Sequence, residues 1–447
     1  MRISHLFILL AASAMLTACD FLDEYNPNSV TVGNYYTSEE DIVASLNGVY
    51  TSLTQSYVAD NYHYFTDVRA NATVVTNSGA NSGIPYQFYN YTLTEENVYV
   101  YNRYSQLYKI ISRANTLFAH LGDVSYATPS ARDTYEAEAR FLRAYFYFEL
   151  VKRYGGVPII GDKVYELNEN IELPRSTFEQ CIKYIVSELD DIKDDLRSLP
   201  LPDAAASAHV VNTQAAQALK IRVLLYAASP LFNEKPIESG NELIGYASYD
   251  RERWKIAADA ARNFINTYGT GDGAIMGLDD NFKNVFTNWY SNEHKEVIFF
   301  RENAMDKTVE TANGPLGLSG AKQGNGRTNP TQNLVDAFLM KDGHFINDKG
   351  KYEYNEQLPY AQRDPRLEYT IIHNGSSWVN STMETWQGGA NNPLGSSYSL
   401  TSYYMRKFMG DFEAANEYQD TQHNWVMFRY AEILLNFAEA ENEYLST

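Results

Sequence analysis

The stretch TPSARDTYEAEARFLRAYFYFELVKRYGGVPI, from Thr128 to Ile159, decides the fold. Thr128 can cap a helix, and Pro129 fits the first turn because proline has no amide hydrogen to leave unpaired there. Gly155-Gly156, followed by Pro158, predicts the other end. Between these boundaries large apolar side chains recur at helical spacing, and small alanines let another helix approach closely. The pattern predicts a long packing helix with one aromatic face.

Four basic residues lie along the same helix: Arg140, Arg143, Lys152 and Arg153. Such a set can bind an anion. However, charges at the edges of a long amphipathic helix are far more often solvated or paired. We therefore expect this helix to be scaffold and not a binding site.

Six other stretches are predicted to be helical, at Glu39–Leu53, Tyr101–His120, Ser176–Leu196, Thr213–Ser229, Asp250–Gly269 and Phe428–Tyr444. The last three repeat the mixture of alanines with large apolar residues. Helix pairs of this kind bury a continuous core in tetratricopeptide arrays, although the strict spacing of about 34 residues is absent here. The predicted fold class is mainly α, with divergent tetratricopeptide-like helix pairs, loop-rich insertions and a few short strands.

The remaining sequence is rich in Asn, Gly, Ser and Tyr. Strand-like runs occur at Glu296–Arg301, Tyr369–Ile372 and Leu400–Phe408, and one short helix is predicted between Asn329-Pro330 and Lys341-Asp342-Gly343. These elements interrupt the loops without forming a second helical array.

No linker-like stretch divides the chain. We predict a single domain over 36–447. Its helical scaffold is expected at about 36–56, 101–270 and 426–447, and its loop-rich ligand region at about 57–100 and 271–425.

The start of the chain is typical of an exported lipoprotein. Arg2 precedes an apolar run from Leu6 to Leu16, which is too short to span a bilayer but suits a secretion signal. The run leads into Ala18-Cys19, which resembles a bacterial lipobox. We predict that residues 1–18 are a signal peptide, that Cys19 is lipidated, and that 19–35 form a tether. Acyl chains such as palmitate would anchor the protein with about 0.8 kcal/mol per buried methylene.

Charge and cysteine content exclude several classes of site. The formal net charge is −20, and an acidic surface repels phosphate backbones, so nucleic acid is not an expected partner. Cys181 is the only cysteine besides Cys19, which excludes an internal disulfide in the mature protein and a cysteine-ligated metal site. We expect Cys181 to be a buried small apolar side chain.

Motifs for catalysis are missing. The sequence has no His-Glu-x-x-His, no phosphate-binding Gly-x-x-x-x-Gly-Lys-Ser/Thr and no Gly-x-Ser-x-Gly, and its histidines lack metal-ligand spacing. The glycine-rich stretch Gly269–Gly273 follows a helix end and is predicted to be a turn. We therefore expect no cofactor, no metal and no enzymatic activity. One alternative stays open, a glycosidase pair drawn from Asp67, Asp279, Asp280 and Asp364.

The motifs, taken in order, resemble the SusD/RagB family of nutrient-binding lipoproteins of Bacteroidetes. The resemblance rests on five stretches besides the lipobox: EEDIVASLNGVY at Glu39–Tyr50, EAEARFLRAYFYFELVKRYGGVPI at Glu136–Ile159, PTQNLVDAFLMKDG at Pro330–Gly343, RDPRL at Arg363–Leu367 and RYAEILLNFAEAEN at Arg429–Asn442. They cover nearly the whole chain, and their shared order makes a chance match improbable.

This resemblance implies a function and partners. It implies a lipoprotein at the outer membrane, facing the cell exterior because Asp20, Asp23 and Glu24 resemble a surface-export signal. It implies capture of oligosaccharides and their transfer to a SusC-type TonB-dependent transporter, with peptide binding as an alternative. In the family more chain follows the last motif, so we expect this sequence to be C-terminally truncated.

Aromatic residues indicate where a glycan would bind. The segment from Tyr57 to Tyr104 holds 11 Tyr and Phe among 48 residues, or 23% against 14% aromatic residues in the chain. Aromatic rings stack on the C–H faces of sugars, and planar polar groups orient the hydroxyls. By resemblance to the family, the segment with Tyr99, Tyr101 and Asn102 corresponds to a stacking aromatic followed by a polar contact. The predicted ligand-binding residues are Asp67, Asn71, Tyr99, Tyr101, Asn102, Trp289, Trp378 and Trp386.

The tryptophans are expected to differ in role. Trp254 falls on a core stripe and Trp425 adjoins the last helix, so both are predicted to be structural. Trp289, Trp378 and Trp386 lie in Asn/Ser/Gly-rich stretches, where a large ring is harder to explain by packing. We expect these three to contact ligand.

Overall fold

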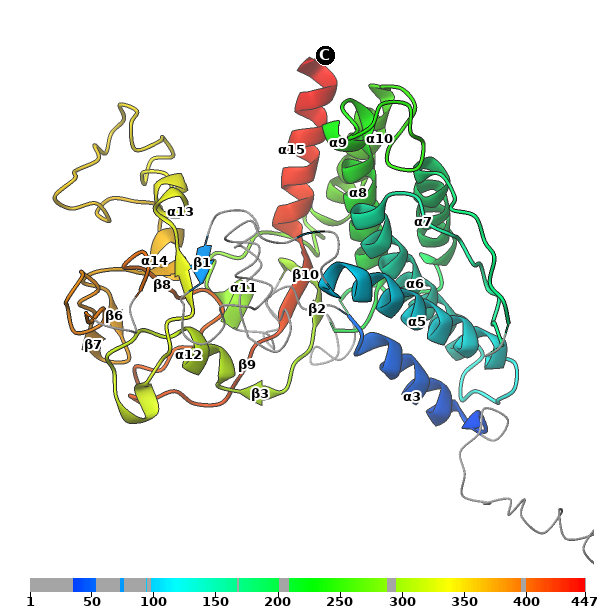
Figure 1. The fold of residues 1–447 in the computed structure, drawn as a ribbon, viewed down its shortest axis with the longest axis horizontal. Coiled ribbons are helices and arrows are strands. Elements are labelled where there is room, and N and C mark those ends of the chain that lie inside the picture. The colour runs from blue at the N-terminus through cyan, green and yellow to red at the C-terminus, as the bar shows by residue number, and fades with distance from the viewer. Residues whose placement is uncertain are drawn as a thin grey trace, which may run out of the picture.

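The computed structural model describes residues 35–53, 73–75, 94, 98–166, 169–200, 209–287, 295–394 and 399–446. For 73–75 and 98–102 it describes the backbone alone. The chain divides into a helical part and a loop-rich part, which lie side by side in Figure 1.

Helices that follow one another in the sequence pack against one another in space. The long helices are α3 (Glu39–Tyr50), α5 (Val98–His120), α6 (Ala131–Tyr154), α7 (Phe178–Ile192), α8 (Thr213–Ala228), α10 (Glu252–Tyr268) and α15 (Tyr430–Ser446). Each contacts the next in this series, and the short helix α9 (Pro230–Asn233) follows α8. The mainly α prediction and its tetratricopeptide-like arrangement are confirmed.

Local signals explain several helix starts. Ser38 begins α3 and Thr177 begins α7 with a capping box, in which the cap side chain and the residue three positions later exchange hydrogen bonds with each other's backbone. The predicted cap at Thr128 is wrong. Helix α6 begins at Ala131 after Ser130, whose side chain makes no capping hydrogen bond.

The end of α6 falls at Gly155, as predicted. Gly155 has φ +70°, and a Cβ there would lie 2.2 Å from the Leu243 carbonyl oxygen. A Cβ on Gly156 would lie 2.1 Å from the Ser176 carbonyl oxygen. Both glycines are therefore required by the close approach of two neighbouring segments.

The basic residues of α6 are paired, as predicted. Arg143 is 2% exposed and contacts Glu188 at 2.8 Å and Asp162 at 2.6 Å. Arg140 also pairs with Glu188, while Lys152 and Arg153 pair with Glu149. The ion pairs with Glu188 join α6 to α7, and the ion pairs with Glu149 stabilise the last turns of α6.

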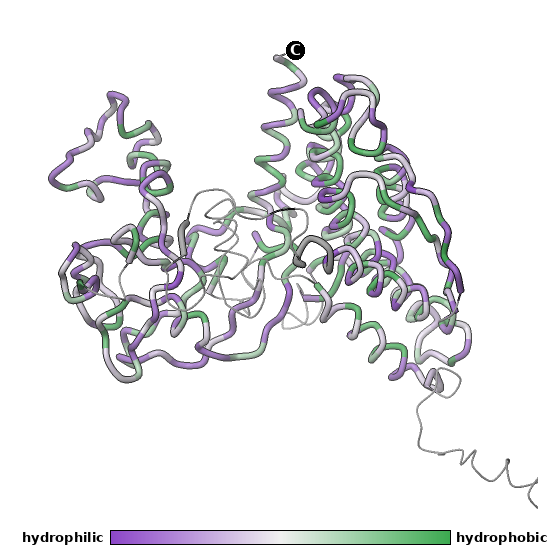
Figure 2. Tube along the Cα trace, in the orientation of Figure 1, coloured by the Kyte–Doolittle hydropathy of each residue, from purple (hydrophilic) through white to green (hydrophobic). Residues whose placement is uncertain are grey.

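The core of the helical part lies between the helices. Its fully buried members include Ile111, Phe141, Leu219 and Ile433, and Cys181 is buried there as expected. Along the helices hydrophobic and hydrophilic residues recur within each turn (Figure 2), which is the amphipathic pattern that the sequence shows. Among the described residues, none of the helices combines the length and the hydropathy that crossing a membrane requires.

The loop-rich part is held by short antiparallel strand pairs. These are β1 (Thr73–Val75) with β4 (Thr328–Pro330), β2 (Val297–Arg301) with β10 (Trp425–Arg429), β3 (Met305–Asp306) with β9 (Thr421–Gln422), β5 (Ile371–Ile372) with β8 (Tyr404–Met405), and β6 (Ser377–Trp378) with β7 (Ser381–Thr382). Between them lie the short helices α11 (Asn284–Thr287), α12 (Thr308–Asn313), η3 (Gly320–Lys322), α13 (Gln332–Ala337) and α14 (Arg366–Thr370). The predicted helix after Pro330 is thus α13, which ends before Lys341 because Phe338 is already extended.

A separate core supports these loops, with Trp378, Tyr404, Tyr418 and Phe412 among its buried residues. Strands β2 and β10 join the two parts: Phe299 packs into the helical core, and its neighbour Phe300 packs into the loop core. Since β10 runs directly into α15, this strand pair fixes the loops to the helices (Figure 1).

Candidate functional site

Most of the predicted ligand-binding side chains are not described by the structure. Cys19, Asp67, Asn71 and Trp289 lie outside the described residues. Tyr99, Tyr101 and Asn102 belong to the first turns of α5, for which the backbone alone is described. The structure therefore places two of the predicted side chains, Trp378 and Trp386.

The prediction for Trp378 is wrong. Trp378 is 1% exposed in β6, and its indole N–H donates to the Tyr418 hydroxyl at 2.9 Å. Phe412 meets the ring edge to face at 6.2 Å, and Arg406 lies over it. The polar sequence around Trp378 belongs to a short hairpin that covers the loop core, so this ring is a packing residue.

Trp386 is exposed over 55% of its surface, in the turn that follows β7. Backbone hydrogen bonds close this turn: Gly389 N–H donates to the Trp386 carbonyl at 2.8 Å, and Gly388 N–H donates to Asn392 at 2.9 Å. Gly388 has φ +94°, a conformation that favours glycine. The turn thus holds a large aromatic ring at the surface.

Two buried asparagines stabilise the same turn by side-chain hydrogen bonds. Asn391 accepts from Glu384 N–H at 2.9 Å and donates to the Leu316 carbonyl at 2.8 Å. Asn392 donates to the Thr385 carbonyl at 3.1 Å. Because these bonds fix the turn before any ligand arrives, little conformational entropy would be lost when a ligand stacks on Trp386.

The structure does not bring Trp386 next to the predicted tyrosines of α5. The β6–β7 hairpin lies at the left edge of the molecule in Figure 1, while α5 lies in the right half. Trp386 and the predicted residues of α5 therefore do not belong to one compact site.

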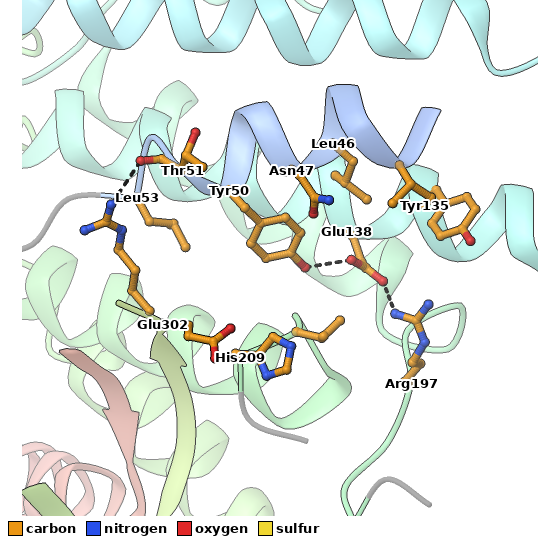
Figure 3. Close-up of a pocket in the computed structure, with 13 residues that line it drawn as sticks. Leu46, Asn47, Tyr50, Thr51, Leu53, Tyr135, Glu138, Arg197, His209 and Glu302 are labelled. Atoms are coloured by element: carbon orange, nitrogen blue, oxygen red, sulfur yellow. Dashed lines mark hydrogen bonds and ion pairs between the residues drawn. The ribbon is translucent and has the colours of Figure 1, made fainter. Parts of the chain in front are cut away.

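A cavity of about 570 Å³ lies between the helices and the end of β2, and sequence reasoning missed it (Figure 3). In Figure 3 Tyr50 projects from α3 with its hydroxyl towards Glu138, while His209 and Glu302 lie across the cavity from α3. Its lining residues are Val43, Leu46, Asn47, Tyr50, Thr51, Leu53, Tyr135, Glu138, Arg197, His209, Val210, Arg301 and Glu302.

Glu138 forms the polar centre of this cavity. Its side chain is 3% exposed, and it accepts from the Tyr50 hydroxyl at 2.7 Å and from Arg197. The Tyr50 oxygen in turn accepts from Val211 N–H at 2.9 Å. Burial raises the pKa of Glu138, although Arg197 and Tyr50 act to lower it. Glu138 lies on the same face of α6 as Leu142 and Tyr145. A carboxylate on an otherwise apolar helix face is the sequence signal that could have located this cavity.

The other ionised groups of the cavity wall are also engaged. Arg301 donates to the Thr51 carbonyl at 3.3 Å and to Asn303 at 3.3 Å. Glu302 accepts from the Gln422 side-chain amide at 3.0 Å. Among the described residues, no set of three His, Cys, Asp or Glu side chains lies close enough to hold a metal ion.

Two sequence profiles match this chain. One, described as the SusD family, matches residues 295–445, and the other, described as "Starch-binding associating with outer membrane", matches residues 20–225. SusD-like protein P2 of Formosa agariphila is 23% identical over 458 residues, which cover 99% of this chain and 77% of that protein. SusD-like protein P38 of the same organism is 25% identical over 196 residues, which cover 44% of this chain and 38% of that protein.

Solved structures show the same fold. A SusD-like protein of Bacteroides fragilis has a TM-score of 0.67 at 23% identity, covering 92% of this chain and 76% of its own. A laminarin-binding SusD-like protein has a TM-score of 0.63 at 20% identity, with 91% and 81% covered. Surface glycan-binding protein A of Bacteroides uniformis has a TM-score of 0.60 at 18% identity, with 90% and 75% covered. From the two profiles, the related sequences and the shared fold, the chain belongs to the SusD family.

Proposed function

We propose that this protein is a non-catalytic glycan-capture lipoprotein of the outer membrane. The observation that carries the proposal is the exposed indole of Trp386, held on a turn that its own hydrogen bonds fix. A rigid aromatic surface beside polar side chains is suited to a sugar ring. The names of two structural neighbours, a laminarin-binding and a surface glycan-binding protein, support the same class of ligand.

The further predicted contacts belong to this proposal. Stacking on Trp386 would be one glycan contact, and the first turns of α5, with the chain that leads into them, would supply a separate one with further aromatic and amide groups. The proposed contacts other than Trp386 are Asp67, Asn71, Tyr99, Tyr101, Asn102 and Trp289.

Affinity electrophoresis through gels that contain laminarin, starch or other polysaccharides tests the proposal. The protein should be retarded by at least one glycan, and Trp386→Ala should remove most of that retardation. Phe345→Ala is the matched control, because Phe345 is a ring of similar exposure, 61%, on the connection between α13 and α14. Migration unaffected by every glycan, together with binding of a peptide pool, would favour the alternative that the ligand is a peptide.

A glycoside hydrolase is the less favoured alternative. Two of the described candidates for the carboxylate pair are engaged locally: Asp279 accepts from Asn281 N–H at 2.8 Å, and Asp364 pairs with Arg366. The Arg366 guanidinium lowers the pKa of Asp364, whereas a general acid needs a raised pKa. Incubation with the bound glycan should release no reducing sugar.

The membrane anchor and the transporter are part of the same proposal. Cys19 would carry the acyl chains, and a SusC-type TonB-dependent transporter would receive the glycan. Metabolic labelling with an alkyne fatty acid should label the protein, and Cys19→Ser should lose both the label and the membrane association. Co-purification from detergent-solubilised outer membranes should recover a transporter, and recovery of the lipoprotein alone would contradict the partnership.

A further inference from the structure

We propose that the cavity between α3, α6 and the end of β2 binds a small neutral ligand with a hydroxylated ring, of the size of a monosaccharide or disaccharide. This site would act independently of the Trp386 turn. The inference rests on the cavity's size, its wall and its charge balance.

The size of the cavity fits a small molecule. Its volume of about 570 Å³ lies within the range of roughly 300–1,000 Å³ that is typical of pockets for small ligands. One or two sugar rings would fill much of this space.

The wall combines apolar surface with planar polar groups. Val43, Leu46 and Leu53 supply apolar surface, and Tyr50 and Tyr135 add aromatic rings. Asn47 and His209 stand among them as polar side chains (Figure 3). A hydroxylated ring, with apolar C–H faces and a polar edge, is complementary to a wall of this composition.

The charges of the wall argue against an ionic ligand. Glu138 and Arg197 are paired with each other, and Glu138 is buried. Arg301 and Glu302 are held by Asn303, Thr51 and Gln422. The two acidic and two basic groups of the wall balance, so an ionic ligand would lose its hydration without gaining a net opposite charge. A neutral ligand can bind while all of these contacts persist.

The cavity and the Trp386 turn belong to different elements. The cavity is built by α3, α6 and β2, whereas Trp386 follows the β6–β7 hairpin, which lies at the left edge in Figure 1 and contributes no residue to the cavity wall. Loss of one site is therefore expected to leave the other intact.

Saturation-transfer difference NMR on the full chain tests the proposal, with neutral hexoses and their disaccharides, the corresponding uronates and glucosamine as probes. At least one neutral sugar should show transfer, and its charged analogues should bind about tenfold more weakly or not at all. Asn47→Trp, which places a large ring in the cavity, should weaken binding by about tenfold or more.

Two controls separate this site from the rest of the molecule. Ala44→Trp puts the same ring on an exposed position of α3 that does not line the cavity, and it should change the affinity less than about twofold. His209→Leu removes a polar lining group and should also weaken binding. The proposal is overturned if none of the neutral sugars binds, if Asn47→Trp binds as tightly as Ala44→Trp, or if the uronates bind equally well. Trp386→Ala should leave these signals unchanged, so the outcome here is distinct from that of the polysaccharide gels.

Discussion

The indole of Trp378 and the hydroxyl of Tyr418 form a buried hydrogen bond of 2.9 Å in the core of the loop-rich part. Both side chains are 1% exposed, so neither can touch a ligand at the surface. The pair holds the β6–β7 hairpin against the segment that leads to β9. Its role is to stabilise the region that carries Trp386.

We predict that Trp378→Ala destabilises the protein, whereas Trp386→Ala does not. Removing a buried tryptophan should lower the free energy of unfolding by about 3–5 kcal/mol, because it leaves a cavity in a packed core. Removing the exposed ring should change it by about 0.5 kcal/mol or less. Urea unfolding followed by circular dichroism measures both variants. Equal stability of the two would contradict the assignment of Trp378 to the core.

Tyr418→Phe tests the hydrogen bond separately from the packing. The substitution keeps the ring but leaves the buried indole N–H without its acceptor, which should cost about 1–3 kcal/mol. The same urea experiment measures it. A Tyr418→Phe protein as stable as the parent would show that the hydrogen bond does not contribute to stability.

The sequence predicted the helices better than the site, and the reason is physical. Helix spacing and glycine stops are local signals, so α6, α8 and α10 could be recognised within a few residues. The start of α6 was misplaced because Thr128 is suited to a cap, yet the chain makes another turn before Ala131 begins the helix.

Burial in the loop-rich part depends on contacts between distant segments. Trp378 and Trp386 lie in equally polar sequence, and only the packing of Tyr418 and Phe412 separates their roles. The cavity at Glu138 also depends on contacts between distant segments, because α3, α6 and β2 are far apart in the chain. A single sequence carries little information about such contacts.

We predict opposite effects of alanine at two glycines. Gly156→Ala would place a Cβ 2.1 Å from the Ser176 carbonyl oxygen and 2.9 Å from Phe178 N, so the backbone must move. The expected loss of unfolding free energy is about 3 kcal/mol, comparable to severe overpacking. Gly48→Ala, inside α3 with nothing within 4 Å of the new Cβ, should instead raise stability by about 0.5–1 kcal/mol.

Thermal unfolding of both variants under the same conditions provides the comparison. Because Gly48 lies in a helix and Gly156 at a close approach, the two midpoints should move in opposite directions. A Gly156→Ala protein with an unchanged midpoint would show that the segment around Ser176 can shift at no cost.

The final prediction concerns acid and Glu149. This carboxylate is 4% exposed on α6 and pairs with Lys152 and Arg153. Burial raises the pKa of Glu149, but the charges and hydrogen bonds of Lys152 and Arg153 outweigh burial and lower it to about 2. A depressed pKa stabilises the folded state above the unfolded pKa of 4.5, and this contribution is lost as the pH falls towards 2. The contribution is on the order of 3 kcal/mol.

Glu149→Gln should therefore lower stability at neutral pH and flatten the decline of stability between about pH 4.5 and pH 2. Unfolding by urea at a series of pH values measures the slope. Glu169→Gln is the matched control, because Glu169 also pairs with a lysine, Lys163, but on the surface, where such pairs contribute little. The control should keep the parent's acid profile. If Glu149→Gln kept that profile as well, Lys152 and Arg153 would not stabilise the ionised form of the carboxylate. The network at the end of α6 would then owe its stability to packing alone.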